Sequence, residues 1–88
     1  MVLPEHTVLV YAFSMSTFQQ ALSEWLRSTG TSQTALAEAV GTTQASINRY
    51  ATGERVPLLR TAQAIVQATG GAVSFEAWQS AFNERRAA

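Results

Sequence analysis

Short stretches with a regular apolar pattern alternate along the chain with polar or glycine-containing breaks, which is typical of several short helices. The first stretch has apolar residues at the i, i+3, i+4, i+7, i+8 spacing of one helix face. These residues are Phe18, Ala21, Leu22, Trp25 and Leu26. The spacing predicts a helix over about 17–28, with Ser16 and Gln19 at capping-box positions. Because tryptophans at such spacing are usually buried, Trp25 is expected in the core.

Two shorter stretches follow and predict helices over about 33–40 and 44–51. Their apolar residues have helical spacing: Leu36, Ala37 and Val40 in the first, Ile47 and Tyr50 in the second. Gly41 lies between them, and glycine can take the positive φ that ends a helix and turns the chain sharply. Thr43 can cap the second helix through its hydroxyl. The combination favours a helix-turn-helix over about 33–51.

A fourth helix is predicted over about 57–68, because proline suits the first turn of a helix and Gly70 and Gly71 follow as a stop. Its expected buried residues are Leu58 or Leu59, Ala62, Ile65 and Val66.

The final segment is predicted to form a fifth helix from about Phe75 to Asn83 or beyond. Ser74 can cap it, and Val73 just before the cap can act as a hydrophobic staple. Residues 72–75 could instead open a strand of a β-hairpin. The aromatic residues favour the helix, since they keep a helical period and not an alternating one. They are Phe75, Trp78 and Phe82. The prediction is an all-α fold with five short helices around one core.

The first fourteen residues stand apart from this pattern and are treated as an N-terminal extension to a domain at 15–88. Residues 7–13 are rich in β-branched and aromatic side chains, which favours an extended conformation. Three interpretations remain open: a strand that pairs with a partner chain, a tail packed on the core, or a disordered extension. Translation could also start naturally at Met15. Partial packing is favoured, because an exposed run this apolar invites aggregation.

Composition removes several classes of function. The 88 residues, 47% hydrophobic and 14% charged, suit one small globular domain. There is no cysteine and a single histidine, His6, and the glutamates show no metal-ligand or paired catalytic spacing. We therefore expect no metal, no cofactor and no enzymatic activity. The longest apolar run, residues 8–13, is too short to cross a membrane and lacks the features of a secretory signal, so a cytoplasmic protein is expected.

The segment 32–50 resembles the helix-turn-helix of the Cro and repressor (XRE-type) family of phage and bacterial regulators. The matching positions are Ser32-Gln33, Leu36-Ala37, Gly41-Thr42-Thr43-Gln44, Ser46-Ile47 and Tyr50. The sequence Gly53-Glu54-Arg55-Val56-Pro57 also resembles the Gly-x-Arg/Lys-x-Pro loop of that family. The resemblance covers roughly residues 18–78, and it implies a compact lambda-repressor-like domain that binds double-stranded DNA.

A recognition helix meets base edges in the major groove with its N-terminal turn. The outward positions of the second helix of the motif are Gln44, Ala45, Ser46, Asn48 and Arg49. Gln44 can pair bidentately with adenine, Arg49 can pair with guanine or a phosphate, and Ala45 can touch a thymine methyl. Asn48 points more sideways. For an arbitrary helical hairpin these residues would be a solvated face, but the matching register favours DNA contact.

The resemblance also implies contacts to the DNA backbone. Gln33 would contact a phosphate and brace Gln44, Thr43 would donate to the backbone while capping its helix, and Arg55 would contact a phosphate. The other arginines are interpreted as solvated surface residues, although a basic tail can follow phosphates: Arg27, Arg60, Arg85 and Arg86. Six arginines balance six glutamates, so the net charge is zero. We expect modest non-specific affinity and a need for dimerisation.

Trp78 and Phe82 are predicted to form a dimer contact, because so small a domain can hardly bury all its aromatic side chains and two-fold dimers read palindromic half-sites. The apolar run at 8–13 could join that contact. The leading hypothesis is a phage Cro-like repressor that binds its operator as a homodimer. The alternative is an antitoxin-type protein that binds a protein partner through its C-terminal helix; a toxin-like reading frame beside the gene would favour it.

Overall fold

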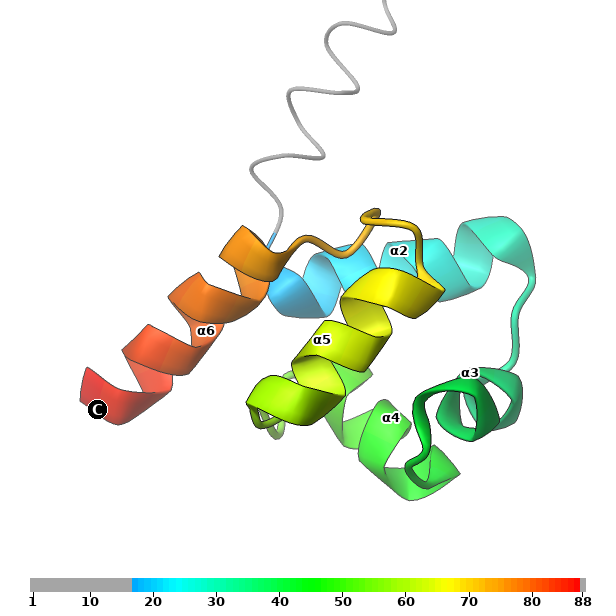
Figure 1. Ribbon diagram of the computed structural model, residues 1–88, viewed down its shortest axis with the longest axis horizontal. Helices are drawn as coiled ribbons and strands as arrows, with labels where there is room; N and C mark the ends of the chain where they lie inside the picture. Colours follow the sequence, from blue (N-terminus) through cyan, green and yellow to red (C-terminus); the bar gives the residue numbers. More distant parts are fainter. Residues whose placement is uncertain (1–16, 88) are drawn as a thin grey trace, which may run out of the picture.

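The computed structural model describes residues 17–87, and every structural statement below concerns this range. Its helices are α2 (Phe18–Thr29), α3 (Gln33–Val40), α4 (Gln44–Thr52), α5 (Leu59–Ala68) and α6 (Phe75–Ala87) (Figure 1). The described range contains no strand, which confirms the expected all-α fold and five helices. The predictions for the N-terminal extension, including His6, lie outside the described residues.

Helix α2 begins with a capping box one residue later than predicted. The Thr17 hydroxyl accepts from the backbone N–H of Gln20 at 3.1 Å, and the Gln20 side-chain oxygen accepts from the backbone N–H of Thr17 at 3.1 Å. The prediction of Ser16 and Gln19 is therefore wrong. The physical reason is that Thr17 has the extended backbone of an N-cap, so the first helical residue is Phe18.

Helix α5 begins two residues later than predicted. Pro57 lies buried in the loop before it, and its carbonyl accepts a hydrogen bond from the indole N–H of Trp78 at 2.7 Å. Leu58 has an extended backbone with ψ 167°, so the helix begins at Leu59 and has no side-chain cap. The expectation that Leu58 or Leu59 is buried is also wrong, since both are exposed.

Helix α6 confirms the helical interpretation of the final segment. The Ser74 hydroxyl accepts from the backbone N–H of Ala77 at 3.1 Å, which caps the helix as predicted. Just before the cap, Val73 is fully buried, and its backbone N–H donates to the hydroxyl of Thr69 at 3.2 Å. The end of α5 is thereby tied to the start of α6, and this places α6 at one side of the molecule, in contact with α2 and α5 (Figure 1).

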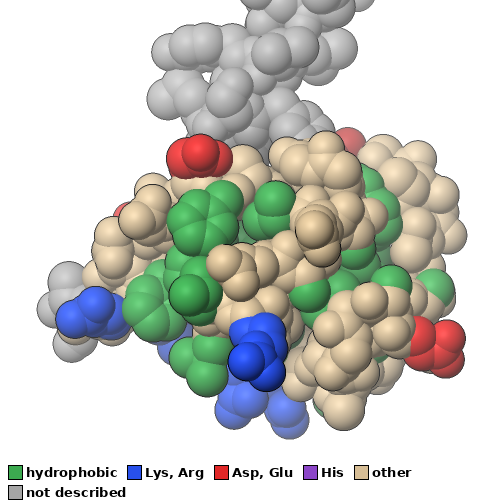
Figure 2. Space-filling model, in the orientation of Figure 1, with side chains coloured by type: hydrophobic (Ala, Val, Ile, Leu, Met, Phe, Trp, Pro, Cys, Tyr) green, Lys and Arg blue, Asp and Glu red, His purple; other side chains and the backbone are tan. Residues whose placement is uncertain are grey.

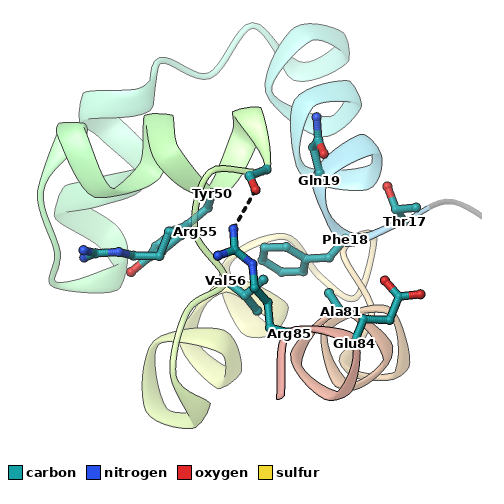
Figure 3. Close-up of a pocket in the computed structure, with 10 residues that line it drawn as sticks. Thr17, Phe18, Gln19, Tyr50, Arg55, Val56, Ala81, Glu84 and Arg85 are labelled. Atoms are coloured by element: carbon teal, nitrogen blue, oxygen red, sulfur yellow. Dashed lines mark hydrogen bonds between the residues drawn. The ribbon is translucent and has the colours of Figure 1, made fainter. Parts of the chain in front are cut away.

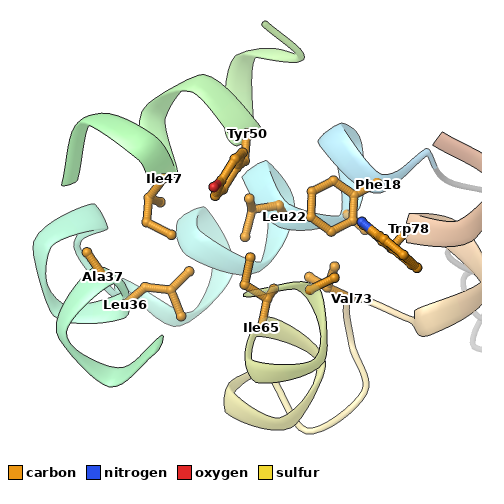
Figure 4. Close-up of a cluster of buried hydrophobic side chains, with 11 residues drawn as sticks. Phe18, Leu22, Leu36, Ala37, Ile47, Tyr50, Ile65, Val73 and Trp78 are labelled. Carbon is orange, nitrogen blue, oxygen red and sulfur yellow. The ribbon is translucent and has the colours of Figure 1, made fainter. Parts of the chain in front are cut away.

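All five helices contribute side chains to one core, which Figure 4 shows. Its buried apolar residues are Phe18, Ala21, Leu22, Leu36, Ala37, Ile47, Tyr50, Ala62, Ile65, Val73 and Trp78. Trp25 was expected among them but is only partly buried and packs at the edge of the core. Because α3 and α4 pack on each other while also meeting α5 and α2 respectively, the core fixes the orientation of the helix pair.

Candidate DNA-binding surface

The turn between α3 and α4 is tight because of Gly41. Its φ is 83°, in the left-handed region that side chains rarely adopt, and its backbone N–H donates to the carbonyl of Ala37 at 2.9 Å. Two residues later, the Thr43 hydroxyl accepts from the backbone N–H of Ser46 at 3.1 Å and caps α4. Both predictions for this turn are confirmed. The turn thus presents the first residues of α4 at the surface.

Helix α4 has one buried side and one open side. Ile47 and Tyr50 face the core as predicted. The outward residues are exposed, apart from the half-buried Ser46: Gln44, Ala45, Asn48 and Arg49. The first turn of this helix therefore carries a set of donors and acceptors that neighbouring elements leave open to solvent, which is the geometry that major-groove recognition requires.

Three side-chain amides form a hydrogen-bonded chain across the two helices. Gln44 Nε2 donates to Gln33 Oε1 at 2.5 Å, and Gln33 Nε2 donates to Asn48 Oδ1 at 3.3 Å. The contact between Gln33 and Gln44 that the family resemblance implied is present. The link from Gln33 to Asn48 was not predicted. Because Gln33 donates to Asn48, the Asn48 side chain points toward α3.

The hydroxyls of Thr43 and Ser46 also bind each other. The two hydroxyl oxygens lie 3.0 Å apart, and the Thr43 oxygen also accepts from the Ser46 backbone N–H. Either hydroxyl proton can rotate into the bond between them, so the pair keeps one proton for a further acceptor.

The loop between α4 and α5, residues 53–58 (called the 53–58 loop below), places a second arginine beside α4. Arg55 is exposed, and its backbone N–H donates to the carbonyl of Arg49 at 3.2 Å. This backbone hydrogen bond holds Arg49 and Arg55 close together in space. In Figure 2, arginine side chains gather at the lower edge of the molecule, and the acidic side chains in view lie at its top and sides. A neutral chain can therefore present a basic edge.

Arg85 is exposed, as expected of a solvated arginine, but it also forms hydrogen bonds that were not predicted. Its Nη2 donates to the carbonyl of Gly53 at 3.0 Å (Figure 3) and to that of Glu54 at 2.6 Å. Arg27 forms an ion pair with Glu24, and Arg60 and Arg86 are exposed, as expected. No local pattern distinguishes Arg85 from its neighbour Arg86, so the sequence carried no signal for its role.

Trp78 was expected at an exposed dimer contact, but it is only 6% exposed. Its indole packs at centroid distances of 5.3 Å from Phe75 and 5.0 Å from Phe82. Because α6 folds back on the core, the domain buries this tryptophan and satisfies its N–H with Pro57. Phe82, in contrast, is half-buried and keeps part of its ring accessible.

Within residues 17–87 there is no group of three or more metal-ligating carboxylate, thiol or imidazole side chains. In the same range, no helix has the length and apolar character needed to cross a bilayer.

A tight turn between two short helices and an open polar first turn on the second define a helix-turn-helix DNA-binding domain. Residues 22–75, more than half of the chain, match the helix-turn-helix family HTH_3. The chain belongs to this family and is a DNA-binding transcription regulator of the XRE type. No curated protein and no solved structure matches it.

Proposed function

We propose that this regulator is a Cro-like repressor of phage type that binds a palindromic operator as a homodimer. The observation that carries the proposal is the outward set on α4, where Gln44 and Arg49 lie exposed on the helix that the turn projects from the domain. Repression would follow from covering a promoter, and the level of the protein would set occupancy. The protein is proposed to act by binding alone and not as an enzyme.

Gln44 and Arg49 are the proposed base-reading residues. An amide NH2 has two protons, so after donating to Gln33 the Gln44 side chain keeps one N–H and a free oxygen. These are the donor and the acceptor needed to bind N7 and N6 of one adenine. Arg49 can bind O6 and N7 of a guanine. Ala45 lies beside Gln44 and is proposed to contact a thymine methyl.

The proposed phosphate contacts flank this set. Arg55 stands on the 53–58 loop with its guanidinium exposed. Gln33 is the first residue of α3, where backbone N–H groups and the helix dipole favour an anion. Thr43 and Ser46 together keep one hydroxyl proton, which is proposed to bind the DNA backbone. Asn48 keeps its NH2 for a neighbouring base or phosphate.

The structure supports a revised dimer surface at the start of α5 and the open side of α6. Leu58 is 72% exposed and Leu59 is 48% exposed, which is unusual for large apolar residues next to a proline loop. Phe75 and Phe82 on α6 are half-buried. Figure 2 shows hydrophobic side chains gathered over α6 and the start of α5. We propose that a second copy of the chain covers this surface and contacts Phe82, as predicted from the sequence. Trp78 is buried and would support the surface only by packing against Phe82.

The antitoxin-type alternative is also served by an apolar surface on α6. It has less support now, because Trp78, the largest side chain expected to bind a partner, is buried.

The proposal is tested by selecting bound sequences from a random double-stranded DNA pool at about physiological salt, where specific and non-specific binding differ by about 10³-fold or more. We expect enrichment of an inverted repeat whose spacing reports the dimer geometry. A single unrepeated motif would refute the dimer, and no enrichment would refute sequence-specific binding. The double variant Gln44→Ala, Arg49→Ala is the control, and it should enrich nothing.

The dimer surface is tested separately by sedimentation of Leu58→Glu. This change should shift the protein to monomer with little loss of helix content, since the side chain is exposed. Ala39→Glu is the matched control, because it adds the same charge at an exposed position on α3. Equal behaviour of the two variants would place the dimer contact elsewhere.

A further inference from the structure

The 53–58 loop is packed at one end and open at the other: Pro57 is fully buried and Val56 packs against the core, but Arg55 is exposed. A hollow of about 350 Å³ opens between this loop, the start of α2 and the end of α6. Figure 3 shows Phe18, Val56 and Ala81 around it. The hollow opens to solvent, so fewer side chains pack against the loop on that side. The Arg55 end of the loop is therefore held chiefly by hydrogen bonds to its backbone.

One face of α6 supplies those hydrogen bonds from both ends of the loop. Trp78 and Arg85 are seven residues apart in the sequence, which is two helical turns, so they lie on the same side of the helix. Trp78 donates to the carbonyl of Pro57, and Arg85 donates to the carbonyls of Gly53 and Glu54. Helix α6 therefore spans the loop and fixes three of its peptide groups.

The bonds from Arg85 are the stronger constraint on the Arg55 end. They bring a charged donor to carbonyls just past the C-terminus of α4, where the helix dipole is negative and carbonyls lack intrahelical partners. Bonds to an ionised donor are also stronger than neutral ones. The peptide that Arg85 holds through Glu54 leads directly into Arg55.

We propose that Arg85 is a positioning residue for DNA binding: it fixes the 53–58 loop so that Arg55 meets a phosphate. This inference rests on the proposed phosphate contact of Arg55. Without Arg85 the loop keeps its anchor at Pro57 and the backbone bond from Arg55 to Arg49, but the two carbonyls of Gly53 and Glu54 lose their partner. The guanidinium of Arg55 then samples more positions and its contact with DNA weakens.

Arg86 is the matched control. It adjoins Arg85, carries the same charge and is exposed, and within residues 17–87 its side chain has no hydrogen bond or ion pair. A role of Arg85 as positive charge alone would be shared by Arg86, whereas a positioning role would not.

The test measures DNA affinity as a function of salt concentration. The probe is a mixed-sequence duplex of about 20 base pairs, which is long enough for two half-sites one helical turn apart. The full chain is used as Arg55→Ala, Arg85→Ala, Arg86→Ala, Arg85→Lys and the double variant Arg55→Ala, Arg85→Ala. Loss of one phosphate contact reduces the salt slope by about 1 per protomer. Circular dichroism at the binding temperature confirms that each variant is folded.

We expect Arg85→Ala to lower affinity and salt slope almost as much as Arg55→Ala, and the double variant to lower them no further. Arg85→Lys should recover part of the loss, and Arg86→Ala should change little. A double variant with twice the loss of slope would show that Arg85 touches phosphate itself, which overturns the inference. Equal effects of Arg85→Ala and Arg86→Ala would also overturn it. If Arg55→Ala binds DNA normally, the proposed phosphate contact fails and the inference falls with it; if only Arg85→Ala binds normally, the inference alone fails.

Discussion

Gln44 donates a side-chain N–H to the side-chain oxygen of Gln33 at 2.5 Å, which ties the first residue of α4 to the first residue of α3. The bond is made before any DNA is present. A side chain that is already held loses less conformational freedom on association. In the proposed function, the bond would therefore prepare Gln44 for a base edge, with Gln33 acting through its neighbour.

This relationship predicts different results for the two glutamines. Gln44→Ala should remove the base contact and cost about 1–3 kcal/mol of discrimination at one base pair. Gln33→Ala should weaken discrimination at the same base pair by a smaller amount, because the contact survives without its brace. The measurement is the Kd for the selected operator and for operators changed at single base pairs. Gln79→Ala, an exposed glutamine on α6, is the control. Effects of the two variants at different base pairs would contradict the bracing role.

A second prediction concerns salt. With Arg55 as the main phosphate contact and Arg49 directed to a base, the slope of log K against log salt should be shallow, about −1 to −2 per protomer. Arg49→Ala should remove sequence preference while keeping most non-specific binding. A uniform fall across all sequences would instead assign Arg49 to phosphate. A slope steeper than about −4 per protomer would require further arginines, such as Arg60, at the DNA.

The bounds of α3 and the start of α4 were predictable from the sequence because their causes are local. Ser32, Gly41 and Thr43 act within four residues of the helix ends that they cap, so the printed sequence contains the whole signal. The same local chemistry predicted which side of α4 faces outward. The prediction from local sequence was less reliable for α5. Proline is common at a helix start, but the Pro57 carbonyl accepts a hydrogen bond from Trp78, 21 residues away.

Contacts distant in sequence account for the features that sequence analysis missed. Arg85 reaches carbonyls 31 and 32 residues earlier, and only the path of α6 decides that it does so while Arg86 does not. Ser23 similarly donates to the carbonyl of Ala51 at 2.8 Å across 28 residues. Trp78 is likewise buried through a contact distant in sequence, the hydrogen bond from its indole N–H to the carbonyl of Pro57, 21 residues away. The small core does leave aromatic residues partly buried, but these are Trp25, Phe75 and Phe82.

Trp78→Phe should destabilise the fold more than its conservative nature suggests. The change removes the donor to Pro57 and leaves a buried carbonyl without its partner, at a cost of about 1–3 kcal/mol, besides the smaller ring. Urea unfolding followed by circular dichroism measures the loss. Phe82→Leu is the comparison, and it should cost less, since Phe82 is only half-buried. An equal or greater loss for Phe82→Leu would mean that the ring stack and not the hydrogen bond holds α6.

Alanine substitutions at Gly41 and Gly53 compare the cost of backbone strain alone with the cost of strain plus side-chain crowding. Both glycines have positive φ, 83° and 81°, so alanine at either position should cost about 1–2 kcal/mol of unfolding free energy from strain alone. A Cβ at Gly41 meets nothing within 4 Å, whereas one at Gly53 would lie 2.2 Å from Gln19 Oε1. The Gln19 amide is the far end of an exposed, flexible side chain that can swing aside, so Gly53→Ala should cost at most slightly more than Gly41→Ala in thermal or urea unfolding.

Removal of Gln19 separates the two causes. Any cost of Gly53→Ala beyond that of Gly41→Ala should disappear in the Gln19→Ala background, because only the crowding involves the glutamine amide. Gln19 is exposed, so its own removal should change stability by less than about 0.5 kcal/mol. If Gly53→Ala costs the same with and without Gln19, the amide swings aside freely and the strain of the left-handed backbone is the whole penalty. Gln19 would then not hold the 53–58 loop, and DNA affinity in Gly53→Ala should depend on Arg85 and not on Gln19.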